Sequence, residues 1–181
     1  CGLCPEHKQH MCLALIEVNT ACNLNCPVCF ANAGAGYSLT LEQVEGMLDR
    51  FVEIEGDPEV IQFSGGEPTI HPQLLEMIQA AKDRGIRQVM VNTNGIRIAK
   101  DDRFLEELAK LEPVVYFQFD GLRPETYRTI RGEDLLDLKL LALDRLHQAG
   151  LNTVLVAAIE YGVNVDEVGA VVEFGLQHPA V

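Results

Sequence analysis

Short β-prone runs alternate with longer segments of helical periodicity along this chain, and this alternation limits the fold more than any other feature. Such a pattern is typical of a parallel sheet whose strands are joined by crossover helices. The predicted strands are 13–18, 60–63, 88–91, 114–119 and 153–159. The predicted helices cover 41–51, 72–85, 101–111, 134–149 and 164–178. The sequence thus predicts an α/β fold of five strand–helix units that stops where a sixth strand would begin.

Four residues near element boundaries carry three local expectations. Thr40 precedes the first helical segment and is a suitable N-cap, and Asn164 or Asp166 would cap the last one. Cys12 falls within the first predicted strand, which favours a buried core thiol.

Polar motifs follow each predicted strand. In parallel α/β folds the carboxyl ends of the strands form the active site, so these motifs should meet at one rim. They are the cysteine loop after the first strand, then Ser64-Gly65-Gly66-Glu67-Pro68, Asn92-Thr93-Asn94-Gly95, Asp120-Gly121 and Glu160.

The cysteine loop places Cys22, Cys26 and Cys29 at the spacing C-x3-C-x2-C. Three thiolates from one loop can hold a soft metal, or a cubic iron-sulfur cluster with one iron left open to a ligand. Structural zinc is an alternative, but it usually needs a fourth ligand, which would come from Cys1, Cys4, Cys12, His7 or His10. Ordinary buried thiols are a second alternative, although the Asn and Pro between the cysteines indicate a loop.

Composition excludes several classes of protein. The chain has 181 residues, 48% of them hydrophobic, which suits one domain at 12–181 after a Cys-rich lead-in at 1–11. Its net charge of -13 disfavours nucleic acid as a partner. No apolar run is long enough for a membrane helix. Six clustered cysteines favour metal or redox sites over disulfides, and hence a reducing, cytoplasmic location.

Four motifs in order resemble the radical S-adenosylmethionine (SAM) superfamily: the cysteine triplet, Gly65-Gly66-Glu67-Pro68, Thr93-Asn94-Gly95 and Asp120-Gly121. The resemblance covers about residues 12–181 and implies a partial (β/α)6 barrel with a [4Fe-4S] cluster on Cys22, Cys26 and Cys29. It also implies that SAM binds the open iron and yields a 5′-deoxyadenosyl radical that abstracts hydrogen from a substrate. Such an enzyme is oxygen-sensitive and needs an electron donor such as a ferredoxin or flavodoxin.

The same resemblance implies a set of SAM contacts. Gly65 and Gly66 permit close backbone approach, and Glu67 offers an acceptor for an ammonium group. Thr93 and Asn94 are either turn residues before Gly95 or cofactor contacts. Two positions depart from the family pattern. Val28 replaces a common aromatic residue next to the adenine, and Gln118 replaces a common Ser two residues before Asp120, the remaining expected contact.

The lead-in carries a second C-x2-C pair, Cys1 and Cys4. A Cys-rich segment before the first barrel strand resembles the subgroup of archaeal tetraether lipid synthases and dihydropterin methyltransferase-like proteins. That resemblance implies an auxiliary iron or iron-sulfur site completed by further cysteines. It also implies a small-molecule or lipid substrate, with carbon–carbon coupling or methyl transfer as the reaction.

Arg123, Arg128 and Arg131 follow the fourth strand. Because Glu125 and Glu133 are nearby, a solvated helix face is one interpretation. The other is that Arg128 or Arg131 holds an anionic substrate group.

Two functional alternatives stay open. The chain could be a non-catalytic iron-sulfur or zinc module for binding or electron transfer. It could also be a thiol–disulfide oxidoreductase using Cys1/Cys4 or Cys26/Cys29, although a redox pair usually opens a helix directly.

Overall fold

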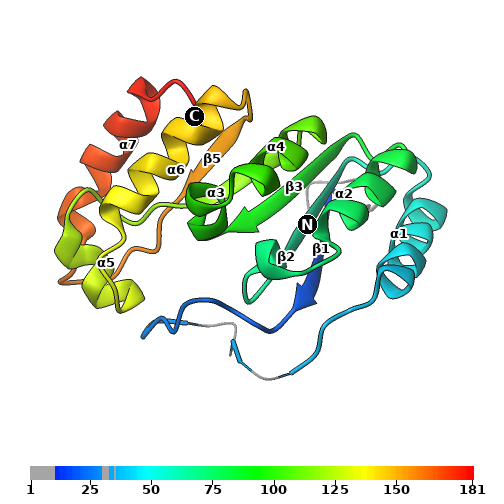
Figure 1. The fold of residues 1–181 in the computed structure, drawn as a ribbon, viewed down its shortest axis with the longest axis horizontal. Helices are drawn as coiled ribbons and strands as arrows, with labels where there is room; N and C mark the ends of the chain where they lie inside the picture. The colour runs from blue at the N-terminus through cyan, green and yellow to red at the C-terminus, as the bar shows by residue number, and fades with distance from the viewer. Residues whose placement is uncertain (1–10, 30–32, 35) are drawn as a thin grey trace, which may run out of the picture.

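The five strands form one parallel sheet. The computed structural model describes residues 11–29, 33–34 and 36–181. The strands are β1 (Leu13–Asn19), β2 (Val60–Gly65), β3 (Gln88–Thr93), β4 (Val114–Gln118) and β5 (Thr153–Val156), and they lie in sequence order across the sheet. Figure 1 shows them side by side, with β1 and β5 at the two edges. The sheet is therefore open, as expected for a partial (β/α)6 barrel.

Crossover helices connect the strands. They are α1 (Leu41–Glu55), α2 (Leu74–Asp83), α3 (Ile96–Lys100), α4 (Asp102–Lys110), α5 (Pro124–Arg131), α6 (Leu136–Gln148) and α7 (Val168–Gln177), with short 3-10 turns at Pro68–Ile70 and Val165–Glu167. In the described part of the chain, no helix is long and apolar enough to cross a lipid bilayer.

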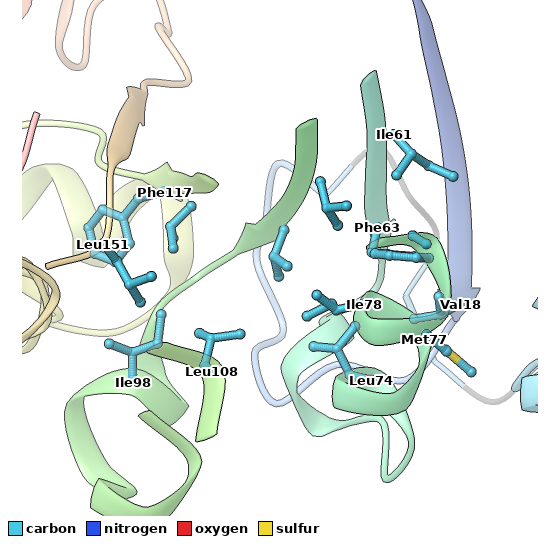
Figure 2. Packing of buried hydrophobic residues seen from close by; sticks show 14 of the residues in the cluster. Val18, Ile61, Phe63, Leu74, Met77, Ile78, Ile98, Leu108, Phe117 and Leu151 are labelled. Atoms are coloured by element: carbon cyan, nitrogen blue, oxygen red, sulfur yellow. The ribbon is translucent and has the colours of Figure 1, made fainter. Parts of the chain in front are cut away.

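The core lies between the sheet and the helices. Figure 2 shows Val18 and Phe63 of the strands next to Met77 and Ile78 of α2. On β1 the buried residues alternate with exposed ones, because only one face of this strand is covered by helices. The opposite, inner face is less covered, and it leaves Leu13, Leu15, Glu17 and Val154 exposed.

The predicted strand–helix order is confirmed, with differences in detail. Two helices, α3 and α5, were not predicted as separate elements; they have only 5 and 8 residues, too few for a clear periodic signal. The fifth strand ends at Val156 rather than at residue 159, because the Asn164 side chain donates to the Ala158 carbonyl and this part of the chain turns away.

Of the three boundary expectations, one is confirmed and two are wrong. Thr40 caps α1 through a reciprocal bond with Gln43. Neither Asn164 nor Asp166 caps the last helix through its side chain. Asn164 donates to the Asp120 and Ala158 carbonyls, and Asp166 accepts from Arg123. Cys12 is exposed and precedes the first strand, because β1 is an edge strand whose pairing with β2 begins only at Leu13.

Candidate functional site

One pocket at the carboxyl ends of the strands brings together most of the predicted site residues. Cys22, Cys26, Val28, Cys29, Gly65, Gly66, Glu67, Thr93 and Gln118 all line it. It also contains Glu17, Leu24, Ser64 and Asn92, which the sequence did not single out as ligands. Asn94 and Arg131, each of which the sequence left between two interpretations, line it as well. Asp120 is fully buried and does not belong to the lining.

The cysteine loop is fixed by local contacts. The backbone N–H of Leu24 donates to Cys22 Sγ at 3.4 Å, and the N–H of Cys29 donates to the Cys26 carbonyl at 3.1 Å. The Leu24 side chain is buried against Tyr127, which anchors the loop to α5. Burial raises the pKa of the Cys22 thiol, and the Leu24 N–H acts against this shift. A bound metal would overcome that shift, since it keeps its thiol ligands deprotonated.

Gly65 and Gly66 bring the end of β2 against the chain that enters the cysteine loop. The Gly66 N–H donates to the Asn19 carbonyl, and the Glu67 N–H donates to the Ala21 carbonyl, both at 2.8 Å. A Cβ atom on Gly66 would lie 2.3 Å from the Ala21 carbonyl oxygen, and Gly65 has a φ of +141°. The close backbone approach expected of these glycines is thus an approach to the protein's own chain, and it positions the cysteines.

Glu67 is an acceptor for four protein donors. Its Oε1 accepts from the Thr69 N–H (3.0 Å), the Thr69 hydroxyl (2.6 Å) and the Thr93 hydroxyl (2.8 Å), and its Oε2 accepts from the Asn94 N–H (2.7 Å). The residue is 1% exposed, so this carboxylate is held by hydrogen bonds rather than by water. Its Oε2 takes only one of these bonds, so it keeps more free acceptor capacity than Oε1.

Thr93 and Asn94 connect this carboxylate to the cysteine loop. The Thr93 hydroxyl also accepts from the Gly95 N–H at 3.0 Å, which is the turn interpretation of that residue. The Asn94 side-chain amide donates to Asn23 Oδ1 at 2.7 Å. Since Asn23 follows Cys22, Asn94 links the end of β3 to the cysteine loop.

Arg131 occupies the opposite wall. Its Nε and Nη2 donate to the two Asp120 oxygens at 2.7 Å each, and Asp120 also accepts from the Ala158 N–H at 3.0 Å. Burial alone would lower the pKa of Arg131, but the bond to Asp120 raises it. In one amide orientation Gln118 Oε1 accepts from the Lys139 ammonium at 3.3 Å, and in the flipped orientation it accepts from Arg131 at 2.9 and 3.1 Å instead.

The structure gives a different answer for Arg128 than for Arg131. Arg128 is exposed and pairs with Glu125 (3.0 Å) and Asp134 (2.6 Å), so it lies on a solvated face. For Arg131 the solvated-face interpretation is wrong, because its side chain is only 9% exposed and points to Asp120. Asp120 therefore acts on the pocket through Arg131. Because Asp120 is fully buried outside the lining, it does not offer a direct contact to a cofactor.

The donor set fits an iron-sulfur cluster. Three thiols line one pocket, and within the described residues no three or more His, Cys, Asp or Glu side chains converge as they would on a single metal ion. Three thiolates from one loop can hold a cubic cluster with one iron left open, whereas a closed zinc site usually needs a fourth ligand. The lead-in with Cys1 and Cys4 lies outside the described residues.

Comparisons with known proteins agree with this geometry. The family described as the radical SAM superfamily matches residues 16–175. A 7,8-dihydro-6-hydroxymethylpterin dimethyltransferase of Methanocaldococcus jannaschii is 38% identical over 98% of this chain and 36% of its own length. A GTP 3′,8-cyclase of Chlorobaculum tepidum is 32% identical over 90% of this chain and 49% of its own.

A solved structure shares the fold. Streptococcus suis SuiB bound to S-adenosylmethionine aligns with a TM-score of 0.72 and 19% identity, over 92% of this chain and 36% of that protein. The chain thus spans between about a third and a half of the length of these three proteins.

Proposed function

Because the chain belongs to the radical SAM superfamily, we propose that Cys22, Cys26 and Cys29 hold a [4Fe-4S] cluster and that SAM binds beside it in the same pocket. When bound, these groups supply an electron and a cleavable sulfur–carbon bond, from which a 5′-deoxyadenosyl radical forms and abstracts hydrogen from a substrate. The protein's own residues position the cofactors and exclude water.

Two walls of the pocket suit the two ends of the methionine part of SAM. The Glu67 region offers acceptor oxygens for the ammonium group, whereas Arg131 and Gln118 offer donors for the carboxylate. Val28 is 39% exposed in the pocket, and it can contact the adenine through its backbone and its small side chain. Thr93 and Asp120 act indirectly, through Glu67 and Arg131.

The observation that carries this proposal is the meeting of three thiols with the Gly65-Gly66-Glu67 turn in one pocket. The test is anaerobic reconstitution of the intact protein with iron and sulfide, followed by dithionite and SAM. We expect about four iron atoms per chain from this cluster and 5′-deoxyadenosine as a product.

Cysteine variants provide the control. Replacing Cys22, Cys26 and Cys29 by Ala should abolish both the cluster and the product, whereas Cys12→Ala, which removes an exposed thiol, should change neither. A fully loaded wild-type protein that forms no 5′-deoxyadenosine would contradict the proposal. It would favour the alternative of a non-catalytic iron-sulfur module.

The substrate we propose carries a 2-amino-4-oxopyrimidine ring, as dihydropterins do. One relative acts on a hydroxymethyl-dihydropterin by its name. On the inner face of the sheet, Glu17, Ser64 and Asn92 come from adjacent strands, and the Asn92 amide donates to Ser64 Oγ at 3.1 Å. The Glu17 carboxylate can accept the paired N–H groups of such a ring.

A nucleoside triphosphate suits this pocket less well. Among the described residues that line it, Arg131 is the one cation, and Asp120 already neutralises it. A triphosphate would need further cations, whereas a neutral pterin needs acceptors. We therefore favour modification of a pterin, such as methyl transfer, over a GTP reaction or lipid coupling.

Four further parts complete the proposal. A low-potential donor such as a ferredoxin or flavodoxin supplies the electron, which suits a reducing, cytoplasmic location. The cluster with its open iron makes the enzyme oxygen-sensitive. Cys1 and Cys4 would hold an auxiliary iron site. Iron content above that of the cluster, lost in a Cys1→Ala/Cys4→Ala variant, is the expected result.

A further inference from the structure

Lys139 is a completely buried lysine that the proposed chemistry does not use. It lies on α6 with no exposed surface, and its ammonium donates to the Asn94 carbonyl at 2.6 Å and to Gln118 Oε1 at 3.3 Å. Both acceptors are neutral amide oxygens. The ammonium also lies 5.2 Å from the centre of the Phe117 ring. Burying a charge among neutral partners is costly, and an apolar side chain of similar length would avoid this cost.

Both hydrogen-bond acceptors are residues that line the cofactor pocket. Asn94 donates its backbone N–H to Glu67 and its side chain to Asn23 in the cysteine loop. Gln118 lies between Lys139 and Arg131, and its single amide oxygen can face only one of these two cations at a time. Lys139 does not line the pocket itself, but it holds two lining residues in place at the ends of β3 and β4.

The charges of the buried groups around the pocket balance only when Lys139 is counted. Asp120 and Glu67 are buried carboxylates, and Arg131 and Lys139 are buried cations. Arg131 pairs with Asp120, so the charge of Lys139 offsets that of Glu67 across the Asn94 peptide unit. Without a protonated Lys139, two carboxylates and one guanidinium would leave one negative charge around the pocket that the three cysteines line.

The influences of neighbouring groups on the pKa of Lys139 agree with this arrangement. Burial lowers the pKa of Lys139 to about 7, and Arg131 acts in the same direction. Asp120, Glu67 and Cys26 act in the opposite direction and favour the charged lysine. An anionic cluster held by Cys26 would also raise the pKa of Lys139.

We propose that Lys139 is a positioning residue of the cofactor pocket, which holds Asn94 and Gln118 in place and supplies the positive charge that offsets the reduced cluster and the carboxylate of SAM. The inference rests on the proposed function. A nearby positive charge favours addition of an electron to a cluster, so Lys139 should raise its reduction potential.

Three substitutions separate charge from hydrogen bonding. Lys139→Met removes both, Lys139→Gln keeps N–H donors without the charge, and Lys139→Arg keeps the charge. Lys110→Met is the matched control, because it removes the same charge from an exposed site on α4, where Lys110 pairs with Glu107. Circular dichroism and iron content would establish that each intact variant is folded and loaded.

The readouts are the cluster midpoint potential, from a redox titration followed by electron paramagnetic resonance, and the Kd for SAM. We expect Lys139→Met and Lys139→Gln to have a more negative potential than Lys110→Met and about tenfold weaker SAM binding, equivalent to about 1.4 kcal/mol. Lys139→Arg should lie closer to the wild type in both.

Two results would overturn the inference. One is that Lys139→Met and Lys139→Gln match Lys110→Met in potential and in SAM affinity. The other is that Lys139→Gln alone restores both to the wild-type values, which would leave no role for the charge. If Lys139→Met does not fold, Lys139→Gln decides between these outcomes. If the cluster-loaded wild type forms no 5′-deoxyadenosine, that result would instead contradict the proposed function.

Discussion

Arg131 and Arg128 lie three residues apart on α5, but only one of them holds a buried partner. Arg131 binds both oxygens of the fully buried Asp120, whereas Arg128 pairs with exposed carboxylates. Removing one partner of a buried pair leaves a desolvated charge, which is far more costly than losing a surface pair.

Arg131→Met should therefore lower the free energy of unfolding by about 3 to 5 kcal/mol. Arg128→Met should lower it by less than about 1 kcal/mol. Urea denaturation of the two variants and the wild type measures both values. Equal losses in the two variants would show that Asp120 does not depend on Arg131.

Glu17 is the residue on which the proposed substrate specificity depends. Its carboxylate faces the pocket from the inner side of β1 and accepts from the Tyr37 hydroxyl only at 3.5 Å, so it has free acceptor capacity. Glu17→Gln replaces one acceptor oxygen with a donor and removes the charge. The Kd for 7,8-dihydro-6-hydroxymethylpterin should rise about tenfold.

Equilibrium dialysis under anaerobic conditions would measure this Kd. Glu53→Gln is the control, since Glu53 lies on the exposed side of α1, away from the pocket, and pairs with Arg50. If Glu17→Gln binds the pterin as tightly as Glu53→Gln does, Glu17 is not a recognition residue.

At the scale of elements, β2 and the cysteine loop depend on each other through Gly66. A Cβ atom at this position would lie 2.3 Å from the Ala21 carbonyl oxygen and 2.5 Å from that of Thr20, both of which are backbone atoms that cannot rotate away. Gly66→Ala should displace the loop, lower the free energy of unfolding by about 1 to 3 kcal/mol and reduce iron loading.

Gly46→Ala provides the opposite control. Gly46 lies within α1 on its exposed side, and a Cβ atom there would meet nothing within 4 Å. Because Ala is the better helix former, this variant should gain about 0.5 to 1 kcal/mol. Urea denaturation and iron analysis of both variants test the argument, and unchanged iron loading in Gly66→Ala would refute it.

Elements with a long periodic pattern could be predicted from the sequence, and short ones could not. α1 shows its apolar spacing and its Thr40 cap in local sequence, and both are confirmed. α5 has a Pro at its first turn, but its polar composition resembles a solvated segment. Its burial depends on Tyr127 and Arg131 meeting partners from other elements, which local sequence does not encode.

The site follows the same division. The thiols and the Gly65-Gly66-Glu67 turn are contiguous motifs, and the structure places them in one pocket. The bond between Asn92 and Ser64 depends on the register of two strands, and the position of Lys139 depends on how α6 packs on the sheet. The roles of these residues can be recognised only from the three-dimensional arrangement of the strands and α6.

At the scale of the whole molecule, the open sheet separates two kinds of surface. One face carries the helices and the core, and the inner face is apolar at Leu13 and Leu15 but polar at Glu17, toward the cysteine loop. The chain carries a net charge of -13, so further negative charge at the pocket would add to the self-repulsion of the molecule. The buried cations at the strand ends act against this field.

The titration of Lys139 links this charge balance to the free energy of unfolding of the cluster-free protein. Its pKa is about 7 in the folded chain, against an ordinary value of 10.5. Below pH 7 the folded and unfolded chains both hold the proton, and the cost of burying the charge is complete. Above pH 7 the unfolded chain binds more protons at this site, so the stability of the wild type rises with pH until about 10.5.

Lys139→Met lacks this titration. The free energy of unfolding of the wild type should therefore increase relative to that of Lys139→Met between about pH 7 and pH 9.5, by at most about 1.4 kcal/mol per pH unit. Urea denaturation of both proteins across this range measures the difference, and a constant difference would contradict the buried position of the charge. In the cluster-loaded protein the negative cluster should raise the pKa of Lys139 and move this rise to higher pH.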